Sequence, residues 1–298
     1  MRSFIFDKYG YYEDDEYGIE FDYKGWHFQL ELTNKTENEV WGMKDFLKSI
    51  PQFFNNLGAD IVLSRDNKLI SDSNYGKVCL VCVKNAKMTA NDVLTFHRAF
   101  SYLGRNVPYK ISHLKSVWET KTDNIEEKIF PRIKYNDSTY SMLMENIAFA
   151  SGLAENAIQY LGDTISFYGD ELHEITLTHK RLSDLESYTF FNPFNMVIDC
   201  PTRDLSELIK NNIISFNEFV SLLTNYNISK ISASILLARL LYPTTLYDML
   251  EEYHLVKHDI SSKIVKYYNN RNNEINKIKS IHKYLVNAYQ IKPIEWLN

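Results

Sequence analysis

The chain has few glycines, and none of them lies in a phosphate-binding motif. Only 10 of its 298 residues are glycine, and Gly10, Gly18 and Gly25 stand alone, with no G-x-G-x-x-G anywhere. A loop that wraps closely around phosphate groups uses several glycines, because the absence of a side chain lets the backbone approach the ligand. The sequence therefore argues against a glycine-rich nucleotide loop.

The chain also has few cysteines, only three. Cys79, Cys82 and Cys200 are an odd and sparse set, which excludes the disulfide framework of small secreted proteins. Cys79 and Cys82 match C-x-x-C, but the surrounding run Lys77–Val83 is typical of a buried strand. Residues three apart in a strand point to opposite faces, so these two thiols cannot share a metal ion. We interpret both as small buried hydrophobic residues.

Long apolar runs are missing too. The N-terminal segment has no stretch of the signal-peptide type. The most apolar segment, 231–242, carries Arg239 and is shorter than the roughly 18–20 residues of a membrane span. We expect no membrane span and a cytoplasmic protein. The net charge is −5 and 45% of the residues are apolar, so we expect a globular protein with no nucleic-acid partner.

The first 83 residues have patterns typical of strands with one helix. Apolar and polar residues alternate over 19–32 around Lys24-Gly25, which predicts a hairpin with one buried face. Thr36–Glu39 is a capping-box pattern, and it predicts a helix over about 38–50 that ends at Pro51. Three further strands follow, so the predicted order is β-β-α-β-β-β.

From Thr89 onward the apolar residues recur with helical spacing. Gly104 and Gly162 each follow an apolar stripe and are candidate helix C-caps, while Ser215–Glu218 is a second capping-box pattern. A short strand-rich patch at about 173–199 interrupts the helices. We therefore predict an α+β chain, with a strand-rich lobe at 1–83 and a larger helical lobe at 84–298.

The residues that could carry chemistry gather in this patch and just after it. The segment Leu177-Thr178-His179-Lys180-Arg181-Leu182 comes first, and Ile198-Asp199-Cys200-Pro201-Thr202-Arg203-Asp204-Leu205 follows. Together they resemble the H-G-D-L…I-D…D-x-P-x-x-D-L stretch of aminoglycoside- and choline-kinase-type phosphotransferases. The resemblance is closest to the CotS/YutH-type spore-coat-associated branch, and residues 232–253 resemble a later helix pair of that branch.

The resemblance implies a bilobal protein-kinase-like fold, with a small antiparallel-sheet N-lobe containing one helix and a larger helical C-lobe. For active members it also implies ATP, Mg²⁺ and a small-molecule hydroxyl substrate, whose proton a catalytic aspartate accepts. His179 falls on the motif histidine, but Arg181 stands where that aspartate should be. A guanidinium stays protonated and cannot act as a general base.

The other functional positions depart from the pattern as well. The strand that should present a phosphate-binding lysine, 27–32, contains none. Asp199 matches either the Mg²⁺-binding aspartate or the first aspartate of D-x-P-x-x-D-L, and the second placement fits better. In an active protein, Asp199 and Asn195 would be the candidate metal ligands, with Asn192 an alternative to Asn195.

These departures predict a catalytically impaired kinase-like protein, a pseudokinase, that needs no cofactor. It would act by binding a protein partner in spore-coat or cell-envelope assembly, in the cytoplasm or with the spore. The alternative is an active ATP- and Mg²⁺-dependent small-molecule phosphotransferase with a displaced set of carboxylates, drawn from Asp184, Asp199 and Asp204.

Three residues of the degenerate loop have more specific expectations. We expect His179 to be buried and to bond to the backbone, and Asp204 to cap a helix N-terminus. We expect Arg181 to be recruited as a structural cation that pairs with Asp199 or Asp204.

Overall fold

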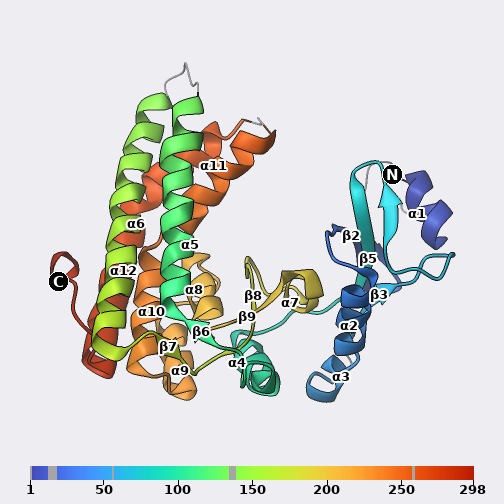
Figure 1. Ribbon diagram of the computed structural model, residues 1–298, viewed down its shortest axis with the longest axis horizontal. Coiled ribbons are helices and arrows are strands. Elements are labelled where there is room, and N and C mark those ends of the chain that lie inside the picture. Colours follow the sequence, from blue (N-terminus) through green and yellow to red (C-terminus); the bar gives the residue numbers. More distant parts are fainter. Residues whose placement is uncertain (1, 13–18, 56, 134–138, 257–258) are drawn as a thin grey trace. The chain divides into compact units, whose positions relative to one another are not determined.

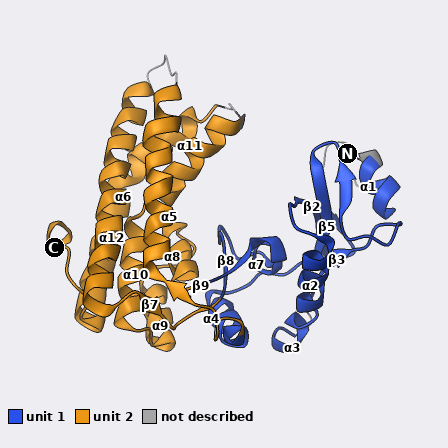
Figure 2. Ribbon diagram, in the orientation of Figure 1, with its two compact units in different colours: residues 1–102, 177–198 blue, residues 103–176, 199–298 orange. Residues whose placement is uncertain are grey.

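The computed structural model describes residues 2–12, 19–55, 57–133, 139–256 and 259–298. The chain is α+β and forms two compact units, each built from two stretches of sequence (Figure 2). Unit 1 contains residues 1–102 and 177–198, and unit 2 contains residues 103–176 and 199–298.

Unit 1 is built on a five-stranded antiparallel sheet, with the strand order β1-β2-β5-β3 and β4 paired to β5. Its strands are β1 (Glu20–Tyr23), β2 (Trp26–Leu32), β3 (Ala59–Val62), β4 (Ser71–Ser73) and β5 (Gly76–Lys84). The predicted hairpin is confirmed, with Tyr23 opposite Trp26. Lys24 and Gly25 both have positive φ angles, 49° and 80°, as a tight two-residue hairpin turn requires.

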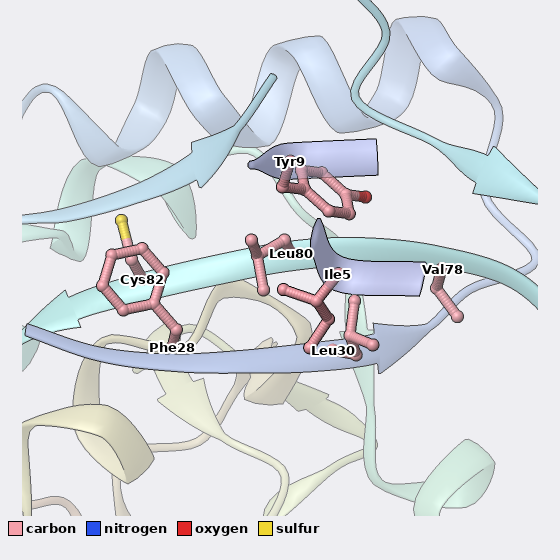
Figure 3. Packing of buried hydrophobic residues seen from close by; sticks show 7 residues of the cluster. All are labelled: Ile5, Tyr9, Phe28, Leu30, Val78, Leu80 and Cys82. Carbon is pink, nitrogen blue, oxygen red and sulfur yellow. The ribbon is translucent and has the colours of Figure 1, made fainter. Parts of the chain in front are cut away.

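One face of the sheet is covered by a helix that the sequence pattern does not predict. This helix, α1 (Arg2–Tyr9), places Ile5 and Tyr9 against Phe28 and Leu30 of β2 (Figure 3). The core cluster is completed by three residues of β5: Val78, Leu80 and Cys82. The apolar run Phe4-Ile5-Phe6 spreads around α1, and only Ile5 and Tyr9, one turn apart, lie in the core cluster. The tertiary contact with the sheet therefore decides the structure of this segment.

The two cysteines of the C-x-x-C pattern are confirmed as buried strand residues. Cys82 shares its face of β5 with Val78 and Leu80, so Cys79 belongs to the alternate set of residues. Both thiols are free, and burial raises the pKa of each to about 12. They are therefore poor nucleophiles and poor metal ligands at neutral pH.

The other α-helices of unit 1 are α2 (Glu37–Leu47), α3 (Ile50–Phe53), α4 (Ala90–Ala99) and α7 (Ser187–Phe191). The predicted capping box is confirmed, because the Thr36 and Glu39 side chains each bond to the other residue's backbone N–H. Pro51 does not end this helix. It lies in the first turn of α3, where its missing N–H has no helical partner to lose.

The segment 177–198 belongs to unit 1 because it packs on the chain that follows β5. It contains the paired strands β8 (Thr176–His179) and β9 (Met196–Asp199) for most of their length. Ser187 donates its backbone N–H to the Ala86 carbonyl, and Met88 donates its own to the Leu185 carbonyl. The two units therefore divide the chain differently from the predicted lobes 1–83 and 84–298.

Unit 2 is a helical unit with one small two-stranded sheet, formed by β6 (Tyr109–Lys110) and β7 (Glu171–Leu172). Its α-helices are α5 (Ile111–Asp123), α6 (Tyr140–Tyr168), α8 (Thr202–Lys210), α9 (Phe216–Tyr226), α10 (Lys230–Leu241), α11 (Thr244–Val256) and α12 (Ser261–Tyr289). The long helix α6 packs against α5, α10 and α12 (Figure 1). The capping box at Ser215 and Glu218 is confirmed at the start of α9. Within the described ranges, no helix is both long and apolar enough to cross a membrane.

Neither predicted glycine C-cap is correct. Helix α6 continues through Gly162 and ends at Gly169, whose φ of 90° only glycine adopts readily. Gly104 follows a short 3₁₀ helix, Ser101–Leu103, rather than an α-helix. Its role is steric, because a Cβ at this position would lie 2.3 Å from the carbonyl oxygen of Ile175.

The C-terminal segment is held by a buried histidine, which predicts a pH dependence of stability. The Ile294 N–H donates to Nε2 of His282 (3.0 Å), and burial lowers the pKa of this histidine. The unfolded chain then binds a proton more readily than the folded chain, so stability is present above the unfolded pKa near 6.5 and falls as the pH drops below it. Thermal melts at pH 7 and pH 5.5 should show a larger loss for the natural chain than for His282→Gln. Equal losses would contradict this assignment.

Candidate functional site

The polar face of β2 forms one wall of the candidate site. Phe28 and Leu30 point into the core of unit 1, so the alternating residues His27, Gln29 and Glu31 lie on the opposite face of the strand. The resemblance to kinase-type phosphotransferases predicts a phosphate-binding lysine on this strand. Glu31 lies there instead, and its side chain has the opposite charge to lysine.

Glu31 is held by two side chains from the 177–198 segment. Tyr188 on α7 donates its hydroxyl hydrogen to Glu31 Oε1, and Asn192 Nδ2 donates to the same oxygen at 2.6 Å. Asn192 Nδ2 also lies 2.9 Å from the Tyr188 hydroxyl. Burial and the neighbouring Glu31 carboxylate raise the pKa of Tyr188, so its phenol stays protonated and remains a donor. Glu31 is thus fixed by two uncharged donors.

These residues line a cavity of about 300 Å³ within unit 1. Its walls come from β2, from the loop after β8, from α7 and from the 3₁₀ helix Pro193–Asn195. The lining residues are Gln29, Glu31, Arg181, Ser183, Tyr188, Thr189, Asn192, Phe194 and Asn195. The cavity is therefore polar and carries side chains of both charges.

Arg181 enters this cavity from a loop that Asn195 holds in place. Asn195 Oδ1 accepts the Arg181 N–H (3.1 Å), while its Nδ2 donates to the carbonyl oxygens of Arg181 (2.7 Å) and Thr189 (3.0 Å). The Arg181 side chain is exposed, and its Nη1 donates to the Lys180 carbonyl (3.0 Å). Asn195, a candidate metal ligand in the sequence, thus uses its amide to fix the backbone.

His179 is a buried structural histidine, as its sequence context predicts. It is fully buried, and its Nε2 donates to the Phe190 carbonyl at 2.8 Å. Its ring packs against Phe96 and Phe190, with ring centroids 4.9 and 4.8 Å away. The hydrogen bond and the packing tie β8 to α7 and α4.

Asp199 lies in unit 2, at the centre of a buried cluster of charges. Arg239 Nη2 donates to its Oδ1 and Arg203 Nη1 to its Oδ2, each at 2.7 Å, and the Cys200 N–H donates to Oδ1 at 2.6 Å. Although burial by itself acts in the other direction, the guanidinium groups of Arg239 and Arg203 hold the pKa of Asp199 below its ordinary value. Tyr109 completes the cluster, 3.4 Å from Arg239 Nη2.

The pairing of Arg181 with Asp199 stays a prediction, because the two residues lie in different units. Both oxygens of Asp199 are bonded to other arginines, one four residues along on α8 and one on α10. The alternative pairing of Arg181 with Asp204 joins residues of different units and stays a prediction. Asp204 itself is fully buried in the first turn of α8, two residues past the helix start at Thr202. Pro201 occupies the N-cap, so the predicted capping role of Asp204 is wrong.

The described part of the chain contains no group of three or more His, Cys, Asp or Glu side chains arranged to hold a metal ion. Asp184, the remaining candidate carboxylate, accepts the hydroxyl of Ser183 and the N–H of Glu186 in a local turn. The candidate carboxylates of the displaced set thus have local structural partners or lie in unit 2.

Three important residues, Glu31, Tyr188 and Arg239, were not singled out as site residues from the sequence, and Asn192 was considered only as a metal ligand. Glu31, Tyr188 and Asn192 meet through contacts between segments more than 150 residues apart, which no local pattern reveals. Arg239 did leave a signal, because a lone arginine in the apolar run 231–242 requires a buried anion.

Comparison with known proteins identifies relatives in one family. A family model described as "Spore coat putative kinase YutH" matches residues 4–286. The endospore coat-associated protein YutH of Bacillus subtilis (strain 168) is 27% identical over 201 residues, which are 59% of this chain and 56% of the relative. The alignment thus spans little more than half the length of that curated relative.

Two solved structures share the fold. An aminoglycoside phosphotransferase from Alicyclobacillus acidocaldarius superposes with a TM-score of 0.56 at 13% identity, covering 89% of this chain and 88% of its own. A spectinomycin phosphotransferase, solved with ADP and spectinomycin, gives 0.53 at 10% identity, covering 90% and 91%. The predicted kinase-like α+β fold is confirmed. Because the family model extends over most of the sequence, the chain belongs to the spore coat YutH family of kinase-like proteins.

Proposed function

We propose that the protein is a pseudokinase that acts in spore-coat or cell-envelope assembly by binding a protein partner. The main support for the proposal is the positive charge of Arg181 in the loop that follows β8. Arg181 stands at the position of the catalytic aspartate and lines the cavity of unit 1. A guanidinium cannot accept the proton of a substrate hydroxyl, so the ordinary phosphoryl-transfer step has no base.

The other residues also fit a magnesium–nucleotide complex poorly. Asp199 has both oxygens bonded to arginines, and Asn195 uses its amide on the backbone. Where a lysine would contact phosphates, β2 carries Gln29 and Glu31, and a carboxylate there repels them. These observations support a protein that has the kinase-like fold but lacks the residues that would bind a magnesium–nucleotide complex.

The assignment to spore-coat assembly rests on the relatives. The Bacillus subtilis relative is described as endospore coat-associated, and the family description names the spore coat. We carry this association over to the present chain as a proposal, with a cytoplasmic or spore-associated location. The partner is then another protein of that assembly rather than a nucleotide-dependent substrate.

Thermal melting with ATP tests the pseudokinase proposal directly. A ligand at a hundred times its Kd stabilises the folded state by about 2.7 kcal/mol, which for a chain of 298 residues corresponds to a rise of about 4 °C in Tm. We expect millimolar ATP with Mg²⁺ to raise the Tm no more than Mg²⁺ with sodium triphosphate, the control for charge and ionic strength. We also expect no ADP release with aminoglycosides, choline or homoserine-like alcohols.

A clear Tm rise with ATP, together with ADP release, would contradict the proposal and favour the alternative, an active small-molecule phosphotransferase with a displaced catalytic set. Asp184→Asn and Asp204→Asn would then identify the carboxylate that acts. A Tm rise without turnover would instead indicate nucleotide binding by a protein that remains a pseudokinase.

A further inference from the structure

Strand β1 forms one edge of the unit 1 sheet, and among the described strands it pairs only with β2. The Leu30 N–H donates to the Ile19 carbonyl (2.8 Å), and the bonds to one neighbour alternate along an antiparallel strand. The N–H and C=O groups of Glu20 and Asp22 therefore point away from β2. Within the described ranges no residue bonds to these four groups, so they are available to a further strand.

The opposite edge of the same sheet is closed by side chains. At β3, Lys44 Nζ donates to the Ile61 carbonyl (2.7 Å), and Asp60 Oδ1 accepts the Ile61 N–H (2.8 Å). Charged side chains at an edge are a common protection against unwanted strand pairing. In the part of the chain that the structure describes, β1 has no contact of this kind. The two edges therefore differ in what they offer to a partner.

The side chains of β1 have a different chemistry on each face of the sheet. Glu20 and Asp22 are exposed and share one face. Phe21 and Tyr23 lie on the other face, where the Tyr11 ring packs against both, with centroids 5.7 and 5.9 Å away. Tyr23 is still 45% exposed. An added strand would thus meet carboxylates on one face and aromatic rings on the other.

The carboxylate face of this edge keeps a negative charge. His27 lies beside both carboxylates, with ring nitrogens 3.2 Å from Asp22 and 3.9 Å from Glu20, and one imidazole can offset at most one of the two charges. Lys24 lies on the aromatic face, with Nζ 5.0 Å from the centroid of the Tyr23 ring. The carboxylate face therefore favours cationic side chains on a partner.

We infer that β1 receives an extended segment of a protein partner as a sixth, antiparallel strand in which basic and aliphatic residues alternate. Residues directly opposite each other in an antiparallel pair have side chains on the same face. The basic residues of the segment therefore lie opposite Glu20 and Asp22 and exchange backbone hydrogen bonds with them. Its aliphatic residues lie against Phe21 and Tyr23. Backbone pairing supplies affinity and the alternating side chains supply specificity.

This inference deepens the proposed function by naming the chemistry of the partner, and it rests on that function only in taking the partner to be a protein. Nucleotide binding has no part in it. The ATP melting experiment and the peptide experiment below therefore fail independently of each other.

The test is binding of a labelled peptide to the full-length chain, measured by fluorescence anisotropy at about 0.15 M salt, where attraction between distant charges is screened. The probe is Lys-Val-Lys-Val-Lys-Val-Lys, with fluorescein at its N-terminus and an amide at its C-terminus. We expect it to bind about fivefold or more tightly than Lys-Lys-Lys-Lys-Val-Val-Val, which has the same charge but cannot place its lysines on one face of a strand. The acidic peptide Glu-Val-Glu-Val-Glu-Val-Glu should bind more weakly still.

N-methylation of the probe separates backbone pairing from charge. Methyl groups on the backbone nitrogens of the lysines remove the N–H groups that face β1, and they should weaken binding about tenfold or more. The same change at the valines alters N–H groups that point away from β1. It should weaken binding much less, although both modified peptides keep every side chain.

Variants of β1 tie the binding to this edge. Glu20→Gln/Asp22→Asn removes both charges and should weaken the alternating peptide roughly three- to tenfold. Its control, Asp45→Asn/Asp66→Asn, removes two carboxylates elsewhere in unit 1, each 64% exposed, and should bind like the natural chain. Glu20→Pro leaves the bonds to β2 intact, because the N–H that it removes points outward, but it should abolish strand addition without lowering the Tm.

Equal binding of the alternating and block peptides would overturn the inference, as would binding that N-methylation of the lysines leaves unchanged. Equal losses in the two double variants would show that the peptide responds to net charge rather than to β1, and would also overturn it. The absence of binding by every peptide would overturn it too, while the pseudokinase proposal would stand.

Discussion

Asp199→Asn should lower the free energy of unfolding by about 3–5 kcal/mol, the usual loss when one partner of a buried ion pair is removed. The side chains of Asp199 and Arg239 are only 6% and 8% exposed, and asparagine would remove the anion that Arg239 and Arg203 both contact. Thermal and urea unfolding, followed by circular dichroism, measure the loss.

A surface ion pair provides the matched control for this variant. Asp163 and Lys292 pair at 2.9 Å with side chains 36% and 45% exposed, and Asp163→Asn should cost only ~0–1 kcal/mol. The double variant Asp199→Asn/Arg239→Met should lose less than the two single losses added together, because the shared contact is counted twice. Similar effects of Asp199→Asn and Asp163→Asn would show that the buried cluster contributes little.

The same cluster predicts a dependence on acid. The folded pKa of Asp199 lies below its ordinary value of 3.8, so its contribution is fully present above that value and is lost as the pH falls through the folded pKa. The stability difference between the natural chain and Asp199→Asn should therefore be constant near neutral pH and shrink below about pH 4. A difference that grows in acid would contradict the ionised state of Asp199.

Gly104→Ala should be the second severe variant. Its Cβ would lie 2.3 Å from the Ile175 carbonyl oxygen and 2.6 Å from the carbonyl carbon, and both are backbone atoms that cannot rotate away. The backbone must shift, at a cost of about 3 kcal/mol, the upper part of the range for overpacked sites. Unfolding in urea measures it.

Gly152→Ala is the control for this variant, and its expected effect has the opposite sign. Gly152 lies within α6, and apart from the local backbone of that helix no atom lies within 4 Å of where its Cβ would be. Alanine should therefore stabilise the protein by about 0.5–1 kcal/mol, because glycine loses more backbone entropy in a helix. A comparable loss in both variants would show that glycine is not needed for close approach at position 104.

The features that were predictable from sequence are those that local chemistry decides. The hairpin at Lys24-Gly25 and the capping boxes at Thr36 and Ser215 each depend on neighbouring residues, and all three are confirmed. Helix α1 was not predicted, because its packing on β2 and β5 stabilises it rather than its own pattern. Gly162 was misinterpreted for a similar reason, since contacts with α5, α10 and α12 stabilise α6 past it.

The candidate site was predictable only in part. The sequence identified His179, Arg181 and Asp199 as motif positions. It did not identify the side chains that bond to them. Asp199 is bonded to Arg239, forty residues away, and Glu31 meets Tyr188 across 157 residues. Side-chain partners at such separations depend on the fold. The charge of Arg181 alone therefore could not predict which side chains lie near it.

Unit 1 is built from two separate stretches of the chain, residues 1–102 and 177–198, and this has a consequence for synthesis on the ribosome. Residues 177–198 supply α7, which bonds to Ala86 and packs Phe190 against Phe96. Until that segment has left the ribosome, the first 102 residues carry an uncovered aromatic surface, although most domains that begin a chain can fold as soon as they emerge. Unit 1 can be completed only after residues 103–176, the first stretch of unit 2, have been made. The early part of the chain must therefore be kept from aggregating for the time that their synthesis takes.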